Sequence, residues 1–191
     1  MKKFVKAAGI LVLVLSAAAI SFGEAALPKN KQTVLDLYVT AKEVFEKQQI
    51  TPDNIKIIDV RTPEEYIFIG HVSTAVNIPI EFLEQSWNAE KKRPVMKTNT
   101  HFVSDVKKKF SSTDTLYVMC RSGNRSARAI NMLAEAGFKS AYNIIGGFEG
   151  DKVKDKGSLY NGRRMVNGWK NSEAPWTYKL NPELMYVPGS N

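Results

Sequence analysis

Cys120 is the only cysteine of the 191-residue chain, and the loop that follows it could hold an anion. The segment reads Cys-Arg-Ser-Gly-Asn-Arg-Ser over residues 120–126 and follows the apolar run 115–119. A loop of this kind turns backbone N–H groups inward, and a helix that begins near Ser126 adds its positive end. These surroundings favour the thiolate, the nucleophilic form of cysteine. The candidate chemistry is therefore attack by the Cys120 sulfur on a small anionic substrate.

Two arginines and a glycine define the charge and the shape of this loop. Arg121 and Arg125 keep their positive charge at any pH of interest, so both are expected to attract a small anionic substrate. Gly123 supplies the backbone freedom that a tight loop requires. The other expected substrate-binding residues of the loop are Ser122, Asn124 and Ser126.

The number of residues between the cysteine and the second arginine distinguishes a phosphatase loop from a loop that holds a persulfide. Tyrosine-type phosphatases have one residue more between the two, which makes a cradle wide enough for phosphate. Four residues separate Cys120 from Arg125, and Met119 stands where a histidine would precede the cysteine. The shorter loop is better matched to one additional sulfur atom on the thiol. The spacing therefore favours a persulfide carrier over a phosphatase.

Alternating strand-like and helix-like segments surround the loop. Short apolar runs predict strands at residues 56–60, 75–79, 115–119 and 141–145. Amphipathic patterns and helix-start signals predict helices at residues 41–48, 63–70, 80–88, 103–110 and 126–136, with a polar connection at 89–100. This order predicts an α/β domain with a mostly parallel central sheet and helices on both faces. Cys120 then lies at the carboxyl end of a strand, where such sheets bind ligands.

The N-terminal residues have the pattern of an export signal. Positive residues precede an apolar stretch at residues 7–22, and the small residues Gly23 and Ala25 fit cleavage after Ala25. We therefore expect a signal peptide at residues 1–25 and a periplasmic or secreted protein. Contact with the membrane is expected only through an uncleaved signal.

The net charge and the numbers of cysteine and histidine residues limit which partners and cofactors are expected. The net charge of +8 favours small anionic substrates, and nucleic acid is not expected as a partner of an exported protein. A lone cysteine in such a chain is either buried and inert or kept for its reactivity. One cysteine with the distant His71 and His101 makes no zinc ligand cluster, so neither a metal nor an organic cofactor is expected.

Two long segments resemble the rhodanese-like sulfurtransferase family: IIDVRTPEEYIFIGHVSTAVNIP and LYVMCRSGNRSARAINMLAEAGFKSAYNIIGGFEG. The resemblance covers about residues 36–150, and GWKNSEAPW is similar to the family's closing segment. It implies one rhodanese-like domain over residues 26–180, with Cys120 as the sulfur-accepting nucleophile. Asp59 and Arg61 match positions beside the active loop, and we expect them to brace it by charge-assisted hydrogen bonds.

The chain departs from the family pattern in two places. Ser73-Thr74 replaces a Pro-Gly pair, which affects only a turn. An insertion at residues 151–167 separates GGFEG from the closing segment, and it is expected to wall the site or to recruit a partner. His71 is expected to make structural hydrogen bonds, the aromatic residues near the insertion to pack back on the domain, and residues 181–191 to form a tail.

The resemblance implies transfer of sulfane sulfur from a donor such as thiosulfate to cyanide or a thiol through a persulfide on Cys120. A protein can also serve as the sulfur acceptor. The alternative is a non-catalytic rhodanese-like module that binds a periplasmic partner. Because modules of that kind often lack the cysteine, the intact loop favours the enzyme.

Overall fold

The structure is a computed structural model that describes residues 27–187. The predicted signal peptide at residues 1–25 lies outside the described residues, and export stays a prediction of the sequence. From residue 27 to residue 187, no helix is both long and apolar enough to cross a membrane.

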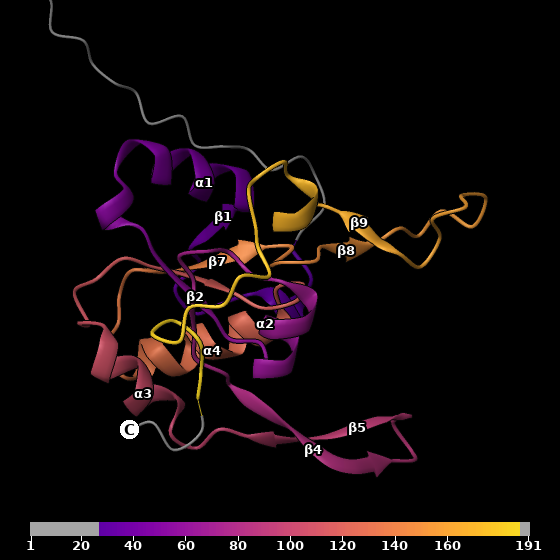
Figure 1. Cartoon of the computed structure of the whole chain (residues 1–191), viewed down its shortest axis with the longest axis horizontal. Helices are drawn as coiled ribbons and strands as arrows, with labels where there is room; N and C mark the ends of the chain where they lie inside the picture. The colour runs from indigo at the N-terminus through magenta and orange to yellow at the C-terminus, as the bar shows by residue number, and fades with distance from the viewer. Residues whose placement is uncertain (1–26, 188–191) are drawn as a thin grey trace, which may run out of the picture.

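Five strands in the described part of the chain form the central sheet, in the spatial order β1-β7-β6-β2-β3 (Figure 1). Their bounds are β1 Tyr38–Thr40, β2 Lys56–Asp59, β3 Val76–Asn77, β6 Leu116–Met119 and β7 Ala141–Ile145. Each strand runs parallel to its neighbours, which confirms the predicted parallel α/β class. Because parallel strands end at one edge, the segments after β2 and β6 lie close together.

Helices cover both faces of the sheet, as predicted. Those of the described residues are α1 Ala41–Ile50, α2 Pro63–Ile69, α3 Phe102–Lys109 and α4 Asn124–Glu135. Apolar side chains of α1 pack on one face of the sheet, and those of α3 and α4 pack on the other. The helix-start signals of α1 and α2 are capping boxes in the structure: Thr40 and Thr62 each bond to the backbone N–H of the glutamate three residues later, and that glutamate bonds back to the backbone N–H of the threonine.

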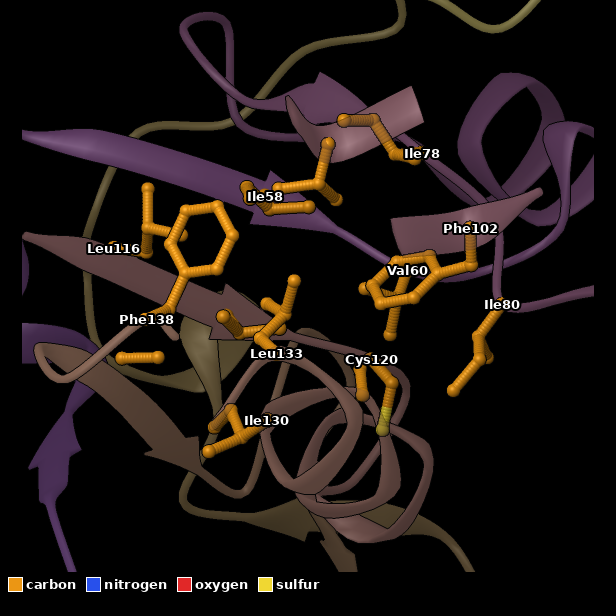
Figure 2. Close-up of a cluster of buried hydrophobic side chains, with 14 residues drawn as sticks. Ile58, Val60, Ile78, Ile80, Phe102, Leu116, Cys120, Ile130, Leu133 and Phe138 are labelled. Atoms are coloured by element: carbon orange, nitrogen blue, oxygen red, sulfur yellow. The ribbon is translucent and has the colours of Figure 1, made fainter. Parts of the chain in front are cut away.

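Side chains of the sheet alternate between two buried clusters. On β2, Ile57 faces a cluster that contains Val44 of α1, and Ile58 faces a second cluster with Ile130 of α4. Burial on both faces is the rule for parallel sheets. Cys120 belongs to the second cluster, and Figure 2 shows its sulfur at the margin of that cluster.

The segment after β3 differs from the prediction. The sequence predicts a helix at residues 80–88, which is wrong, and a polar connection at 89–100, which in the structure contains a strand at residues 93–98. The chain instead forms an antiparallel hairpin of β4 (Glu81–Asn88) and β5 (Arg93–Thr98). Its side chains are mostly half-buried or exposed, so no apolar periodicity marks the strands. Pairing between the two strands, rather than local preference, decides this structure.

The insertion at residues 151–167 forms a second hairpin, of β8 (Asp151–Lys152) and β9 (Arg164–Val166). Figure 1 shows both hairpins projecting toward the same side of the molecule. Trp169, just after this hairpin, is fully buried, as expected for an aromatic residue that packs back on the domain. Tyr160 stays half exposed on the hairpin itself.

The last described residues pack along the edge strand β3. The backbone N–H of Asn77 donates to the carbonyl of Leu184 at 2.7 Å, and the ring of Tyr186 contacts Phe82 of β4. An edge strand leaves backbone groups without strand partners, so this segment covers part of the sheet edge.

Candidate active site

Cys120 directly follows β6 and is one of the residues that line a cavity of about 680 Å³. Its side chain is only 1% exposed and belongs to the second buried cluster. The backbone N–H of Gly123 donates to Sγ at 3.2 Å, and the Ser126 hydroxyl oxygen lies 3.5 Å from Sγ. Helix α4 begins at Asn124, two residues before its predicted start, and its positive end therefore adjoins the sulfur.

A buried asparagine of β7 holds the turn after the cysteine. The side-chain amide of Asn143 donates to the carbonyls of Gly123 and Lys31, both at 3.1 Å. Its side-chain oxygen accepts from the Ser126 hydroxyl at 2.7 Å. Ser126 therefore links Asn143 to the sulfur of Cys120. Sequence reasoning missed Asn143, because a polar residue within a strand gives no sign of what it faces.

Arg125 points to carboxylates of two other elements. Its guanidinium donates to both oxygens of Glu65 on α2, at 2.6 and 2.7 Å, and lies 3.6 Å from Glu81 of β4. Burial lowers the pKa of Arg125, but the hydrogen bonds and charge of Glu65 outweigh this and raise it above its ordinary value. Burial likewise raises the pKa of Glu65, and Arg125 reverses this to a net lowering. The positive charge of Arg125 is thus largely compensated within the protein.

Other arginines lie at the rim of the cavity. Arg121 is exposed, and Arg93 of β5 and Arg164 of β9 reach the same cavity from the two hairpins. The Arg164 guanidinium donates to the carbonyl of Gly150 at 2.6 Å. Burial lowers the pKa of Arg164, and the positive charge of Arg121 lowers it further. Both arginines line the same cavity, where their like charges disfavour each other.

Asp59 and Arg61 form a buried ion pair beside the loop and do not line the cavity. The Arg61 side chain also donates to the carbonyl of Gly70 at 2.8 Å and lies 4.1 Å above the ring of Phe148. Burial lowers the pKa of Arg61, but Asp59 outweighs this and raises it. The backbone N–H of Phe148 donates to the carbonyl of Cys120 at 2.8 Å. The pair thus contacts the loop through Phe148.

His71 ties the closing segment of the domain to the sheet. Its ring nitrogens lie 3.1 Å from the carbonyl oxygen of Tyr66 and 3.3 Å from that of Lys179, and its ring stacks on Tyr66. Its backbone pairs with Thr177. The side chain is buried away from the cavity, in agreement with the expected structural role.

The cavity brings the predicted loop together with residues that the sequence did not single out. Five loop residues line it: Cys120, Arg121, Ser122, Asn124 and Arg125. Six charged residues of other elements join them: Glu64 and Glu65 of α2, Glu81 of β4, Arg93 of β5, Arg128 of α4 and Arg164 of β9. Three of these six lie on hairpins that the sequence did not predict. Glu65 had a local signal in the sequence, its place in the helix-start pattern of α2.

Comparison with known proteins agrees with the fold and the loop. The rhodanese-like domain family matches residues 40–154. The chain is 33% identical over 129 residues to the uncharacterized protein RC0915 of Rickettsia conorii, covering 68% of this chain and 88% of that protein. It is 34% identical over 93 residues to the chloroplastic thiosulfate sulfurtransferase 16 of Arabidopsis thaliana, covering 49% of this chain and 70% of that protein.

A solved structure has a similar fold. The crystal structure of Rv0390 from M. tuberculosis superposes with a TM-score of 0.56 at 25% sequence identity, covering 74% of this chain and 96% of that chain. The family match spans more than half of the present sequence and includes the whole cysteine loop. On these grounds, the chain belongs to the rhodanese-like domain family.

Proposed function

We propose that the protein is a rhodanese-type sulfurtransferase that carries sulfane sulfur as a persulfide on Cys120. One observation supports this most directly: the Cys120 sulfur accepts a hydrogen bond from the backbone N–H of Gly123, and Cys120 lines a cavity together with the loop that follows it. Hydrogen bonds from donors and the positive end of α4 stabilise an anionic sulfur. The rhodanese-like family and the name of the Arabidopsis relative point in the same direction.

The reaction has two half-reactions. The Cys120 thiolate attacks the outer sulfur of thiosulfate, a new S–S bond forms, and sulfite leaves with the electron pair of the broken S–S bond. The persulfide anion then stays in the loop. Cyanide or an acceptor thiolate attacks its terminal sulfur, and the Cys120 thiolate is regenerated. No net proton is taken up or released when cyanide is the acceptor.

The loop residues have separate proposed roles. The N–H of Gly123 stabilises the anionic sulfur, Ser126 keeps the turn beside the sulfur through its hydrogen bond to Asn143, and Ser122 and Asn124 contact the bound donor. Arg121 attracts the anionic donor from solvent. The Asp59–Arg61 pair holds the loop through Phe148.

Replacement of the cysteine tests the proposal directly. Cys120→Ser removes the nucleophile but keeps the size and the burial of the side chain. We expect the wild-type protein to gain the mass of one sulfur atom after treatment with thiosulfate, and the variant to gain none. Thiosulfate–cyanide turnover at the wild-type level in Cys120→Ser would refute the proposal. Thermal unfolding of both proteins serves as the control for folding.

A second candidate function is a non-catalytic partner-binding module. It is favoured by large apolar side chains that the two hairpins expose, Trp87 at 64% and Leu159 at 95%. The same mass measurement separates the two functions. A folded wild-type protein that gains no sulfur from thiosulfate or from an organic persulfide supports the binding module.

A further inference from the structure

The arginines that line the cavity fall into two groups. Arg125 is paired with Glu65 and Glu81, and Arg128 lies 3.5 Å from Glu81. The other three have no carboxylate of residues 27–187 within ion-pair distance: Arg93 of β5, Arg121 of the loop and Arg164 of β9. Unpaired guanidinium groups are the ones that retain capacity for an external anion.

Arg164 reaches the cavity because its hairpin starts beside the active loop. The turn after β7 is bonded to the loop: Phe148 donates to the carbonyl of Cys120 at 2.8 Å, and Glu149 donates to that of Arg121 at 2.9 Å. Two residues later, Asp151 at the start of β8 is paired with Lys31 at 2.6 Å. The hairpin therefore leaves the domain next to the cysteine, and β9 returns along it.

The Arg164 side chain is also held in place. Its guanidinium donates to the carbonyl of Gly150 at 2.6 Å, which leaves further N–H groups for a ligand in the cavity. Burial lowers the pKa of Arg164, and the positive charge of Arg121, which lines the same cavity, lowers it further. An anion bound between two such groups relieves their repulsion and gains two charge-assisted contacts.

We propose that Arg164, supplied by the inserted hairpin, is a specificity-determining residue that binds the anionic end of the sulfur donor together with Arg121. The proposal rests on the sulfurtransferase function proposed above. The inserted hairpin then contributes a substrate-binding residue to the site. With two arginines at the anionic end, a donor with two negative charges is favoured over a donor with one.

The neighbouring Arg163 gives a matched control. Both arginines lie on the same hairpin and carry the same charge, but the Arg163 guanidinium lies 5.9 Å from the ring of Tyr160 and does not line the cavity. Arg163→Gln and Arg164→Gln therefore lower the net charge equally. Only Arg164→Gln removes a guanidinium group from the cavity.

The experiment measures sulfur transfer to cyanide from thiosulfate, a dianion, and from methanethiosulfonate, a monoanion. For Arg164→Gln we expect kcat/KM for thiosulfate to fall about ten-fold, with kcat within about two-fold of the wild type. The loss with methanethiosulfonate is expected to be clearly smaller. Arg164→Lys should recover part of the loss, and Arg163→Gln should stay within about two-fold for both donors.

The outcomes separate this inference from the proposed function. Equal kinetics of Arg164→Gln and Arg163→Gln, in a wild-type protein that transfers sulfur, overturn the role of Arg164 and leave the sulfurtransferase intact. An equal loss for both donors overturns the charge preference. A wild-type protein that forms no persulfide overturns the proposed function itself. Thermal unfolding of each variant excludes misfolding as the cause.

Discussion

Arg125 shows how a residue of a reactive loop acquires a structural partner. The sequence places it in the loop as a cation that steers an anionic donor, and the structure surrounds it with Glu65 and Glu81. An ion pair with two parallel hydrogen bonds connects α2 to the first turn of α4. A pair of this kind stabilises the position of the loop and reduces the net attraction for a third charged group.

The Glu65–Arg125 pair predicts a pH dependence of stability. The folded protein lowers the pKa of Glu65 below its ordinary value of 4.5, so the stabilisation is complete above pH 4.5 and is lost as the pH falls through the lowered pKa. We expect Glu65→Gln to lower the free energy of unfolding by about 2 kcal/mol at pH 7 and to flatten its decline in acid. Urea unfolding at pH 7 and below pH 4.5 measures both effects.

Glu64 provides the control for this prediction. It lies in the same first turn of α2, carries the same charge and is exposed. Glu64→Gln should change the free energy of unfolding at pH 7 by less than about 0.5 kcal/mol. Equal losses in the two variants would mean that Glu65 contributes nothing beyond its charge at the helix start.

At the scale of elements, the turn after β7 packs against the active loop through backbone atoms alone. Gly147 adopts a φ of 58°, and a Cβ at this position would lie 2.3 Å from the carbonyl oxygen of Cys120. It would also lie 2.9 Å from backbone atoms of Arg121 and Ser122. A side chain here therefore displaces the loop that holds the sulfur.

A comparison of two glycine variants tests this contact. Gly137 also has a positive φ, of 97°, but a Cβ there would meet nothing within 4 Å. Gly137→Ala should cost about 1–2 kcal/mol of unfolding free energy from backbone strain alone. Gly147→Ala should cost about 3 kcal/mol and should also slow persulfide formation. Equal losses of stability, with unchanged persulfide formation, would show that the loop does not depend on this contact.

Residues 27–187 form a packed parallel domain and two hairpins that extend to one side of it (Figure 1). The outer part of the β8–β9 hairpin is bonded mainly to itself, with Val153 donating to Arg163 and Gly162 donating to Val153, both at 2.9 Å. Its base, in contrast, is anchored to the domain through Asp151 and Lys31. Stability and site geometry are therefore expected to depend on the base of the hairpin and not on its far end.

Shortening the β8–β9 hairpin tests whether its outer part contributes to stability and to the geometry of the site. Replacing residues 154–161 by a short turn keeps Arg163, Arg164 and the base of the hairpin. We expect the midpoint of thermal unfolding to change by less than about 3 °C and thiosulfate turnover to stay within about two-fold of the wild type. If the shortened protein lost as much turnover as we expect for Arg164→Gln, the outer part of the hairpin would be needed for the site.

Much of the site could be predicted from sequence because its signals are local. The cysteine, the glycine and the two arginines of the loop are contiguous, and both capping boxes span only four residues each. The two hairpins could not be predicted in the same way. Their strands pair only with each other and have no buried face, so the apolar periodicity that identifies strands is absent.

The sequence by itself determined the parallel α/β class, the strand and helix that flank the loop, and the position of Cys120 between them. Each of these depends on residues that are neighbours in the chain. Only the tertiary structure decided which charges meet at the cavity: Glu65 pairs with Arg125, while Arg164 stays unpaired beside Arg121. The physical reason is that these pairings join residues far apart in the sequence, and their geometry follows from how the elements pack.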